Sequence, residues 1–97
     1  MDGVRFWAFV DRSGPLTACW LWKGGRNGRT GYGCVMMEYA YRTQRAHRVA
    51  WELYYRRRIP VGLQVDHLCR VRLCCNPLHL EVVTQAENMR RAREWAA

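Results

Sequence analysis

Four metal-binding side chains lie close together in one short stretch of this 97-residue chain: His67, Cys69, Cys74 and His79 follow the spacing H-x-C-x4-C-x4-H. A chain of this length buries only about 60–65% of the surface that its unfolded form exposes, so its apolar core alone is marginal. A structural metal is a common remedy at this size, and thiols with a nearby imidazole are typical zinc ligands. The spacing therefore predicts one small domain, residues 1–97, stabilised by a structural zinc ion.

Three of the predicted zinc ligands are Cys69, Cys74 and His79. His67 is kept out of the predicted zinc shell and assigned to the second group of residues described below, although it is two residues from Cys69. The fourth ligand must come from elsewhere in the chain.

Cys19 is the favoured fourth ligand because it precedes a predicted hairpin and would tie the N-terminal part to the cysteine loop. Cys75 and Cys34 are the alternatives. Cys75 adjoins Cys74, and two neighbouring residues do not easily point at the same ion.

Asp66, His67 and Asn88 remain for a second function. A carboxylate and an amide can hold a hard divalent cation, and an imidazole can deprotonate a water molecule. These three residues predict a hydrolytic site, provided that the strand breaks near Asp66 so that both adjacent side chains reach it.

The expected fold class is α+β, with a small antiparallel sheet. Residues 1–16 predict a short helix or extended lead-in, and residues 17–58 predict hairpin strands at 19–22, 35–41 and 42–46 followed by a helix over 46–57. Residues 63–95 predict a strand, a loop, a second strand and a helix that opens at Thr84. The expected buried helix positions are Val49, Ala50, Leu53 and Tyr54 in the first helix, and Met89, Ala92 and Trp95 or Ala96 in the last.

A strong positive charge indicates the partner. The chain has 16 Lys and Arg residues against 8 Asp and Glu, a net charge of +8, and Lys23 is its only lysine. Arginine offers a planar fork of donors that matches phosphate, so this bias predicts a nucleic-acid partner. No window has the length of a membrane span. The odd number of cysteines, 5, argues against a disulfide framework and predicts a reduced, cytoplasmic protein without a membrane partner.

Several ordered motifs resemble a phage-type HNH endonuclease, over about residues 17–91. They are C-W-x-W-x-G at 19–24, G-Y-G at 31–33, A-H-R-x-x-W-E-L at 46–53, I-P-x-G at 59–62, V-D-H-x-C at 65–69, C-x-N-P-x-H-L-E at 74–81 and E-N at 87–88. This family is one of the His-Me finger, or ββα-metal, nucleases. The zinc spacing is similar to that of the His-Cys box homing endonucleases, which belong to the same group.

The resemblance implies a ββα-metal unit in which His67 is the general base and Asn88 and Asp66 hold a catalytic Mg²⁺ or Mn²⁺. It implies the same structural zinc set, Cys19, Cys69, Cys74 and His79, and products with a 5′-phosphate and a 3′-hydroxyl. Asn76, the Asn of the HNH motif, is expected to brace the loop.

The expected substrate is double-stranded DNA, cut by a monomer that nicks or by a homodimer that makes paired cuts. Arg48 is the first candidate to contact the scissile phosphate, with Arg45 and Arg42 behind it, and His47 beside it is expected to be structural. No separate DNA-reading module is evident, so low sequence specificity is expected. The alternative is a zinc-stabilised DNA-binding module without catalysis.

Overall fold

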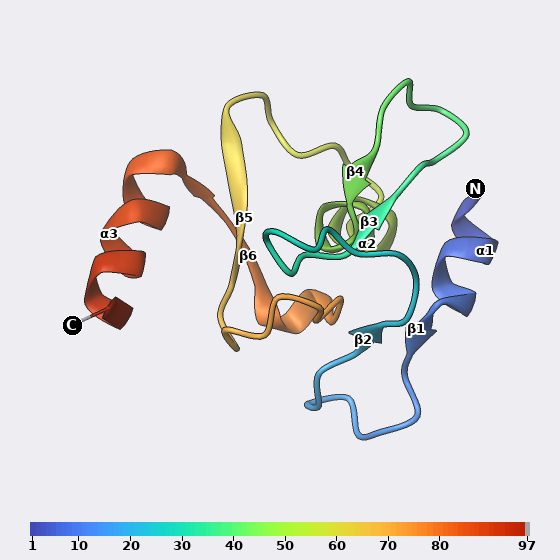
Figure 1. Ribbon diagram of the computed structural model, residues 1–97, viewed down its shortest axis with the longest axis horizontal. Helices are drawn as coiled ribbons and strands as arrows, with labels where there is room; N and C mark the ends of the chain where they lie inside the picture. The colour runs from blue at the N-terminus through green and yellow to red at the C-terminus, as the bar shows by residue number, and fades with distance from the viewer. Residues whose placement is uncertain (97) are drawn as a thin grey trace.

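The computed structural model describes residues 1–96. Its elements in chain order are α1 (Gly3–Ala8), β1 (Val10–Asp11), β2 (Leu21–Trp22), β3 (Cys34–Val35), β4 (Gln44–Arg45), α2 (Ala46–Tyr55), β5 (Leu63–His67), the 3-10 helix η1 (Pro77–His79), β6 (Leu80–Thr84) and α3 (Gln85–Ala96). In Figure 1 the β5–β6 hairpin lies in the middle, with α3 on one side and the N-terminal half of the chain on the other. The predicted α+β class is confirmed.

The predicted strand–loop–strand–helix unit is present. β5 pairs with β6 in an antiparallel register that sets Asp66 opposite Glu81 and His67 opposite Leu80. α3 follows β6 directly, and the Thr84 hydroxyl accepts a hydrogen bond from the Glu87 backbone N–H at 3.1 Å. A Thr cap of this kind satisfies one of the backbone donors that the first turn leaves free.

The N-terminal sheet differs from the prediction. Within residues 1–96, β1 pairs with β2 and β3 pairs with β4, so these strands form two separate antiparallel pairs instead of one sheet. The strand expected over residues 35–41 ends at Val35. The reason is competition from the N-terminus: the Met1 amino group donates to the Met36 carbonyl at 3.1 Å, and the Glu38 N–H donates to the Met1 carbonyl at 3.0 Å.

The main core lies between α1, α2 and the short N-terminal strands. Phe6 stacks on Trp22 with ring centroids 5.0 Å apart, and both side chains are buried. The α2 residues Val49 and Ala50 close this core, as predicted, whereas Tyr54 is 51% exposed. α2 ends at Tyr55, earlier than predicted, because Arg56 adopts a left-handed conformation with φ 54°.

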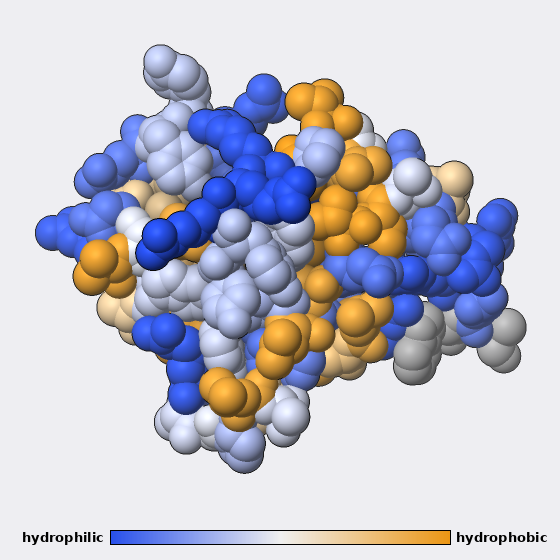
Figure 2. Space-filling view, turned by 180° about the vertical axis from the view of Figure 1, so that it is seen from behind, coloured by the Kyte–Doolittle hydropathy of each residue, from blue (hydrophilic) through white to orange (hydrophobic). Residues whose placement is uncertain are grey.

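The last helix is attached by charge more than by an apolar stripe. Met89 is 56% exposed and Ala92 is also exposed, so the burial predicted for these two residues is wrong; the side chains of Trp95 and Ala96 lie outside the described part. Arg91 instead forms ion pairs with Asp66, Glu81 and Glu87. In Figure 2 hydrophilic residues cover most of the α3 end of the molecule, and the largest hydrophobic area lies toward the middle of that face.

The cysteine loop is joined to the N-terminal half by backbone pairing. The Trp22 N–H donates to the Leu73 carbonyl at 2.8 Å, and the Cys75 N–H donates to the Trp20 carbonyl at 2.7 Å. Leu21 and Cys74 form an isolated antiparallel bridge. Segments more than fifty residues apart in the chain therefore lie side by side around the loop. Within residues 1–96, no helix is both long enough and apolar enough to cross a lipid bilayer.

Candidate active site and metal centre

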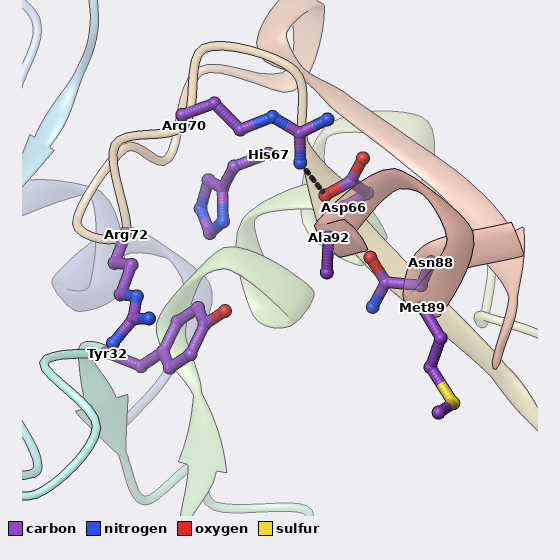
Figure 3. A pocket seen from close by; sticks show the side chains of 8 residues that line it. All are labelled: Tyr32, Asp66, His67, Arg70, Arg72, Asn88, Met89 and Ala92. Atoms are coloured by element: carbon purple, nitrogen blue, oxygen red, sulfur yellow. Dashed lines mark hydrogen bonds and ion pairs between the residues drawn. The ribbon is translucent and has the colours of Figure 1, made fainter. Parts of the chain in front are cut away.

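The strand–loop–strand–helix unit brings Asp66, His67 and Asn88 to one pocket of about 380 Å³. Asp66 and His67 are the last two residues of β5, and Asn88 lies near the start of α3. Figure 3 shows the three side chains around this pocket, together with Tyr32, Arg70 and Arg72. The two adjacent β5 residues line the same pocket although β5 continues through both.

A backbone carbonyl holds the His67 ring. The ring is 5% exposed, and its Nε2 lies 2.9 Å from the Cys74 carbonyl oxygen. Because a carbonyl can only accept, Nε2 carries the proton and Nδ1 keeps its lone pair. Burial lowers the pKa of His67 below its ordinary value, so the ring is neutral over a wider pH range. Such a ring can accept a proton at Nδ1.

Two arginines hold the Asp66 carboxylate. Oδ1 accepts from Arg70 Nη1 at 2.8 Å and Oδ2 accepts from Arg91 Nη1 at 3.1 Å. Asp66 is 6% exposed, and a buried carboxylate requires ion-pair partners of this kind. The two ion pairs therefore fix the position of the Asp66 side chain at the pocket.

Asn88 is oriented by its amide nitrogen. Nδ2 donates to Gln64 Oε1 at 2.6 Å, so the amide oxygen is the atom available to a cation. In Figure 3 that oxygen lies on the side of the amide that faces Asp66. A carboxylate and an amide oxygen at one pocket form a donor set that suits Mg²⁺ or Mn²⁺.

The arginines are distributed differently from the expectation. Arg48 and Arg45 line a neighbouring pocket of about 280 Å³, while Arg70 and Arg72 line the pocket of Asp66 and His67. Arg48 Nη1 donates to the Leu63 carbonyl at 3.2 Å, and Arg42 is exposed. Sequence reasoning missed Arg70 and Arg72, although their place in the loop that starts at the predicted base was a usable signal.

His47 packs behind the site. Its ring is 4% exposed and lies 4.3 Å from that of His67 between centroids, and its Nε2 donates to the Val65 carbonyl at 3.2 Å. Burial, with a smaller contribution from His67, lowers the pKa of His47 to about 3. A ring that stays neutral and packed is consistent with the structural part expected for it.

The second group of candidate ligands is Cys19, Cys69, Cys74 and His79. Their ligand atoms all lie within 4.8 Å of one another, and burial raises the pKa of the Cys74 thiol. His79 Nδ1 is 3.6 Å from Cys19 Sγ and 3.4 Å from Cys74 Sγ. Tetrahedral zinc with ordinary bond lengths sets sulfur and nitrogen ligands about 3.5 Å apart, so this group can hold a zinc ion.

The surroundings of this cluster also suit a metal centre. His79 Nε2 donates to the Thr17 carbonyl at 2.9 Å, which leaves Nδ1 free to bind a metal. The competing thiols lie elsewhere: Cys75 is buried in the aromatic core, where burial raises its pKa to about 12, and neither Cys75 nor Cys34 is in the cluster found within residues 1–96.

Asn76 braces the loop, as expected. It is fully buried, and its Nδ2 donates to the Leu16 and Ala18 carbonyls, both at 2.7 Å. Its Oδ1 accepts from the Leu78 N–H at 3.0 Å. One amide thereby joins the segment before Cys19 to the loop that carries the other three candidate ligands.

Comparison with known proteins gives one family and two phage relatives. Residues 44–90 match the HNH endonuclease family. Protein 2.8 of Escherichia phage T7 is 38% identical over 72 residues, which cover 74% of this chain and 47% of that protein. An uncharacterized gene 5.3 protein of Enterobacteria phage T3 is 37% identical over 43 residues, 44% of this chain and 42% of that protein.

The chain therefore spans less than half the length of these curated relatives. No solved structure is significantly similar to it. The family match contains Asp66, His67, Asn88 and three of the four cluster residues, whereas Cys19 comes from outside the matched segment.

Proposed function

We propose that this chain, whose residues 44–90 match the HNH endonuclease family, is a metal-dependent endonuclease that hydrolyses phosphodiester bonds in double-stranded DNA. One observation carries the proposal: Asp66, His67 and Asn88 line a single pocket. A module that only bound DNA would not need an oriented imidazole beside a carboxylate and an amide oxygen. This combination matches the parts that metal-assisted hydrolysis requires.

His67 is the proposed general base. Its Nε2–H is bonded to the Cys74 carbonyl, so the Nδ1 lone pair is left to take a proton from an attacking water molecule. The lowered pKa supports this role, because only the neutral ring can take a proton. As the water oxygen bonds to phosphorus, the bond from phosphorus to the 3′ oxygen breaks. His67 then carries the proton removed from the water, and the 3′ oxygen takes a proton from solvent to become the 3′-hydroxyl.

Asp66 and Asn88 are the proposed ligands of the catalytic Mg²⁺ or Mn²⁺. When bound, such a cation supplies charge neutralisation at the phosphate and at the 3′ leaving oxygen. Gln64 keeps the Asn88 amide turned with its oxygen available. Arg70 and Arg91 hold the Asp66 carboxylate in place through their ion pairs.

Arg72 and Arg48 are the proposed phosphate contacts. Arg72 lines the pocket of Asp66 and His67, and the Arg72 guanidinium offers donors to the oxygens of the reacting phosphate. Arg48 lines the pocket beside it and is anchored at the Leu63 carbonyl. The net charge of +8 supports binding along the DNA backbone with low sequence specificity.

Zinc at Cys19, Cys69, Cys74 and His79 is proposed as structural, within one nuclease domain that spans residues 1–97. The four ligands complete a closed tetrahedral set, which leaves no position for a reacting water. A monomer has one proposed active site per chain and would nick one strand.

The test is plasmid nicking. Purified wild type, His67→Ala and Asn88→Ala are incubated with supercoiled plasmid and Mg²⁺ or Mn²⁺, with Gln85→Ala as the control on the exposed face of the same helix turn. We expect wild type and Gln85→Ala to nick, and the other two variants to lose at least about a hundredfold in rate while keeping zinc and DNA binding. If His67→Ala nicks like wild type, His67 is not the general base. If wild type binds DNA without cutting it, the chain is a binding module instead.

A further inference from the structure

The loop before β3 presents one aromatic ring to the site. Tyr32 stands between Gly31, which has φ 78°, and Gly33, where an added Cβ would come within 2.5 Å of Trp22 and 3.1 Å of Ala46. The Asn27 N–H donates to the Tyr32 carbonyl at 2.9 Å. Only glycine suits both flanking positions, so the backbone of the G-Y-G motif is fixed and directs Tyr32 inward.

The Tyr32 ring lies against two arginines and two histidines. The guanidinium carbon of Arg45 is 4.1 Å from the ring centre and that of Arg72 is 5.2 Å from it. The rings of His47 and His67 lie 5.4 Å and 5.9 Å away, both at 27° to it. A tyrosine face attracts guanidinium groups, so the ring restrains two side chains that are otherwise long and flexible.

Tyr32 also separates two pockets. It lines the pocket that contains Arg72, Asp66 and His67, and it lines the neighbouring pocket that contains Arg45 and Arg48. Figure 3 shows the ring at the edge of the first pocket, with Arg72 beside it. Each pocket therefore receives one of the two arginines that contact Tyr32.

The neighbouring pocket differs from the first in its charge. Its lining within the described residues is Tyr32, Arg45, His47, Arg48, Gln64, Val65 and Asn88, with no carboxylate among them. The guanidinium groups of Arg45 and Arg48 and the amide nitrogen of Gln64 offer donors to an anion, and no bound cation is needed there. A phosphodiester is an anion with this hydrogen-bonding requirement.

We propose that this neighbouring pocket is a subsite for the phosphate next to the scissile one, and that Tyr32 is a positioning residue that holds Arg45 in it and Arg72 at the reacting phosphate. The proposal rests on the proposed endonuclease function. Because the two pockets share Tyr32 and Asn88, two consecutive phosphates of one strand can occupy them together. Stacking restrains the arginines before DNA arrives, which reduces the entropy lost on binding.

The first arm of the test measures binding without added divalent cation. The affinity for a fluorescein-labelled 20-base-pair duplex is followed against salt concentration for Arg45→Gln, Tyr32→Leu, Tyr32→Phe and the double variant Tyr32→Leu/Arg45→Gln. The matched control is Tyr39→Leu with Arg58→Gln, a Tyr–Arg contact of 5.9 Å that lines neither pocket.

We expect Arg45→Gln to lower the slope of log affinity against log salt by about 0.9, the value for one phosphate contact. Tyr32→Leu should lower the slope by at least as much, Tyr32→Phe should behave like wild type, and the double variant should lose less than the sum of the single variants. Additive effects, or losses no larger than those of the Tyr39 and Arg58 controls, would overturn the proposal.

The second arm measures cleavage of duplexes in which single phosphates are replaced by neutral methylphosphonates. In wild type, a neutral linkage on one side of the cleaved bond should slow cleavage at least about tenfold, and Arg45→Gln should be insensitive to that substitution. Wild type that cuts but ignores neutral neighbours would refute the subsite and leave the nuclease intact. Wild type that cuts nothing would refute the nuclease, while the binding arm would still decide whether Arg45 and Tyr32 form a phosphate site.

Discussion

Replacement of Asn76 tests whether a single buried amide joins the two halves of the domain. Asn76→Ala removes two bonds donated to the Leu16 and Ala18 carbonyls and one accepted from the Leu78 N–H. Each such bond contributes about 1 kcal/mol net, and a buried partner left unsatisfied costs more. Because Asn76 is fully buried, we expect the free energy of unfolding to fall by about 2–4 kcal/mol, out of a total of about 5–15 kcal/mol for a domain of ordinary stability.

Asn76→Asp should be worse than Asn76→Ala, although it is the closer match in shape. The carboxylate can still accept from Leu78, but its second oxygen would face two carbonyl oxygens at the positions where Nδ2 now lies 2.7 Å from each. Repulsion replaces attraction there, and a buried charge lacks a partner. The expected order of stability is therefore Asn, then Ala, then Asp.

Urea unfolding of the zinc-loaded protein, followed by tryptophan fluorescence, measures these differences. Asn27→Ala is the control, because Asn27 also accepts two backbone N–H bonds, at 2.8 Å and 3.1 Å, but lies in an exposed loop. It should cost no more than about 1 kcal/mol. If Asn76→Ala costs as little as Asn27→Ala, or if Asp is tolerated better than Ala, the amide is not the brace described above.

The remaining predictions concern metal, pH and substrate. Elemental analysis should find one zinc per chain. Cys69→Ser should unfold the domain and Cys34→Ser should not, because Cys69 belongs to the ligand cluster and Cys34 does not. Burial lowers the pKa of His67 from its ordinary value near 6.5. The fraction of neutral His67, and with it the nicking rate, should therefore rise with pH below about 6.5 and level off above that pH. A nicking rate that keeps rising tenfold per pH unit up to pH 9 would contradict a histidine base. Unrelated DNA duplexes should compete about equally for binding, and a strong preference for one short site would contradict the expected low specificity.

Those parts of the fold that depend on local chemistry could be predicted from the sequence. Four ligand-type side chains with short spacings have few other uses in a small domain, and the cluster contains Cys19, the predicted fourth member. Within residues 63–95, the two short apolar segments, the loop between them and the Thr84 cap all indicate the same strand–loop–strand–helix unit. Local signals that point to the same unit are the most dependable kind.

Other parts depended on partners that the sequence does not reveal. β1 and β2 have two residues each, too short to show alternation, and the segment after β3 bonds to Met1 instead of extending that strand. The apolar period in α3 predicted burial, but the ion pairs of Arg91 hold that helix instead. Arg70 and Arg72 lie in a loop, where no periodicity indicates which way a side chain points.

Cys74 contributes to two sites with different atoms. Its sulfur belongs to the four-residue ligand cluster, and its carbonyl oxygen holds Nε2 of His67. A molecule that lacks zinc would lose the loop geometry and the orientation of the proposed base together. A partly demetallated sample would then be a mixture of fully active and wholly inactive molecules, and the activity per bound zinc would stay constant while the activity per chain declined.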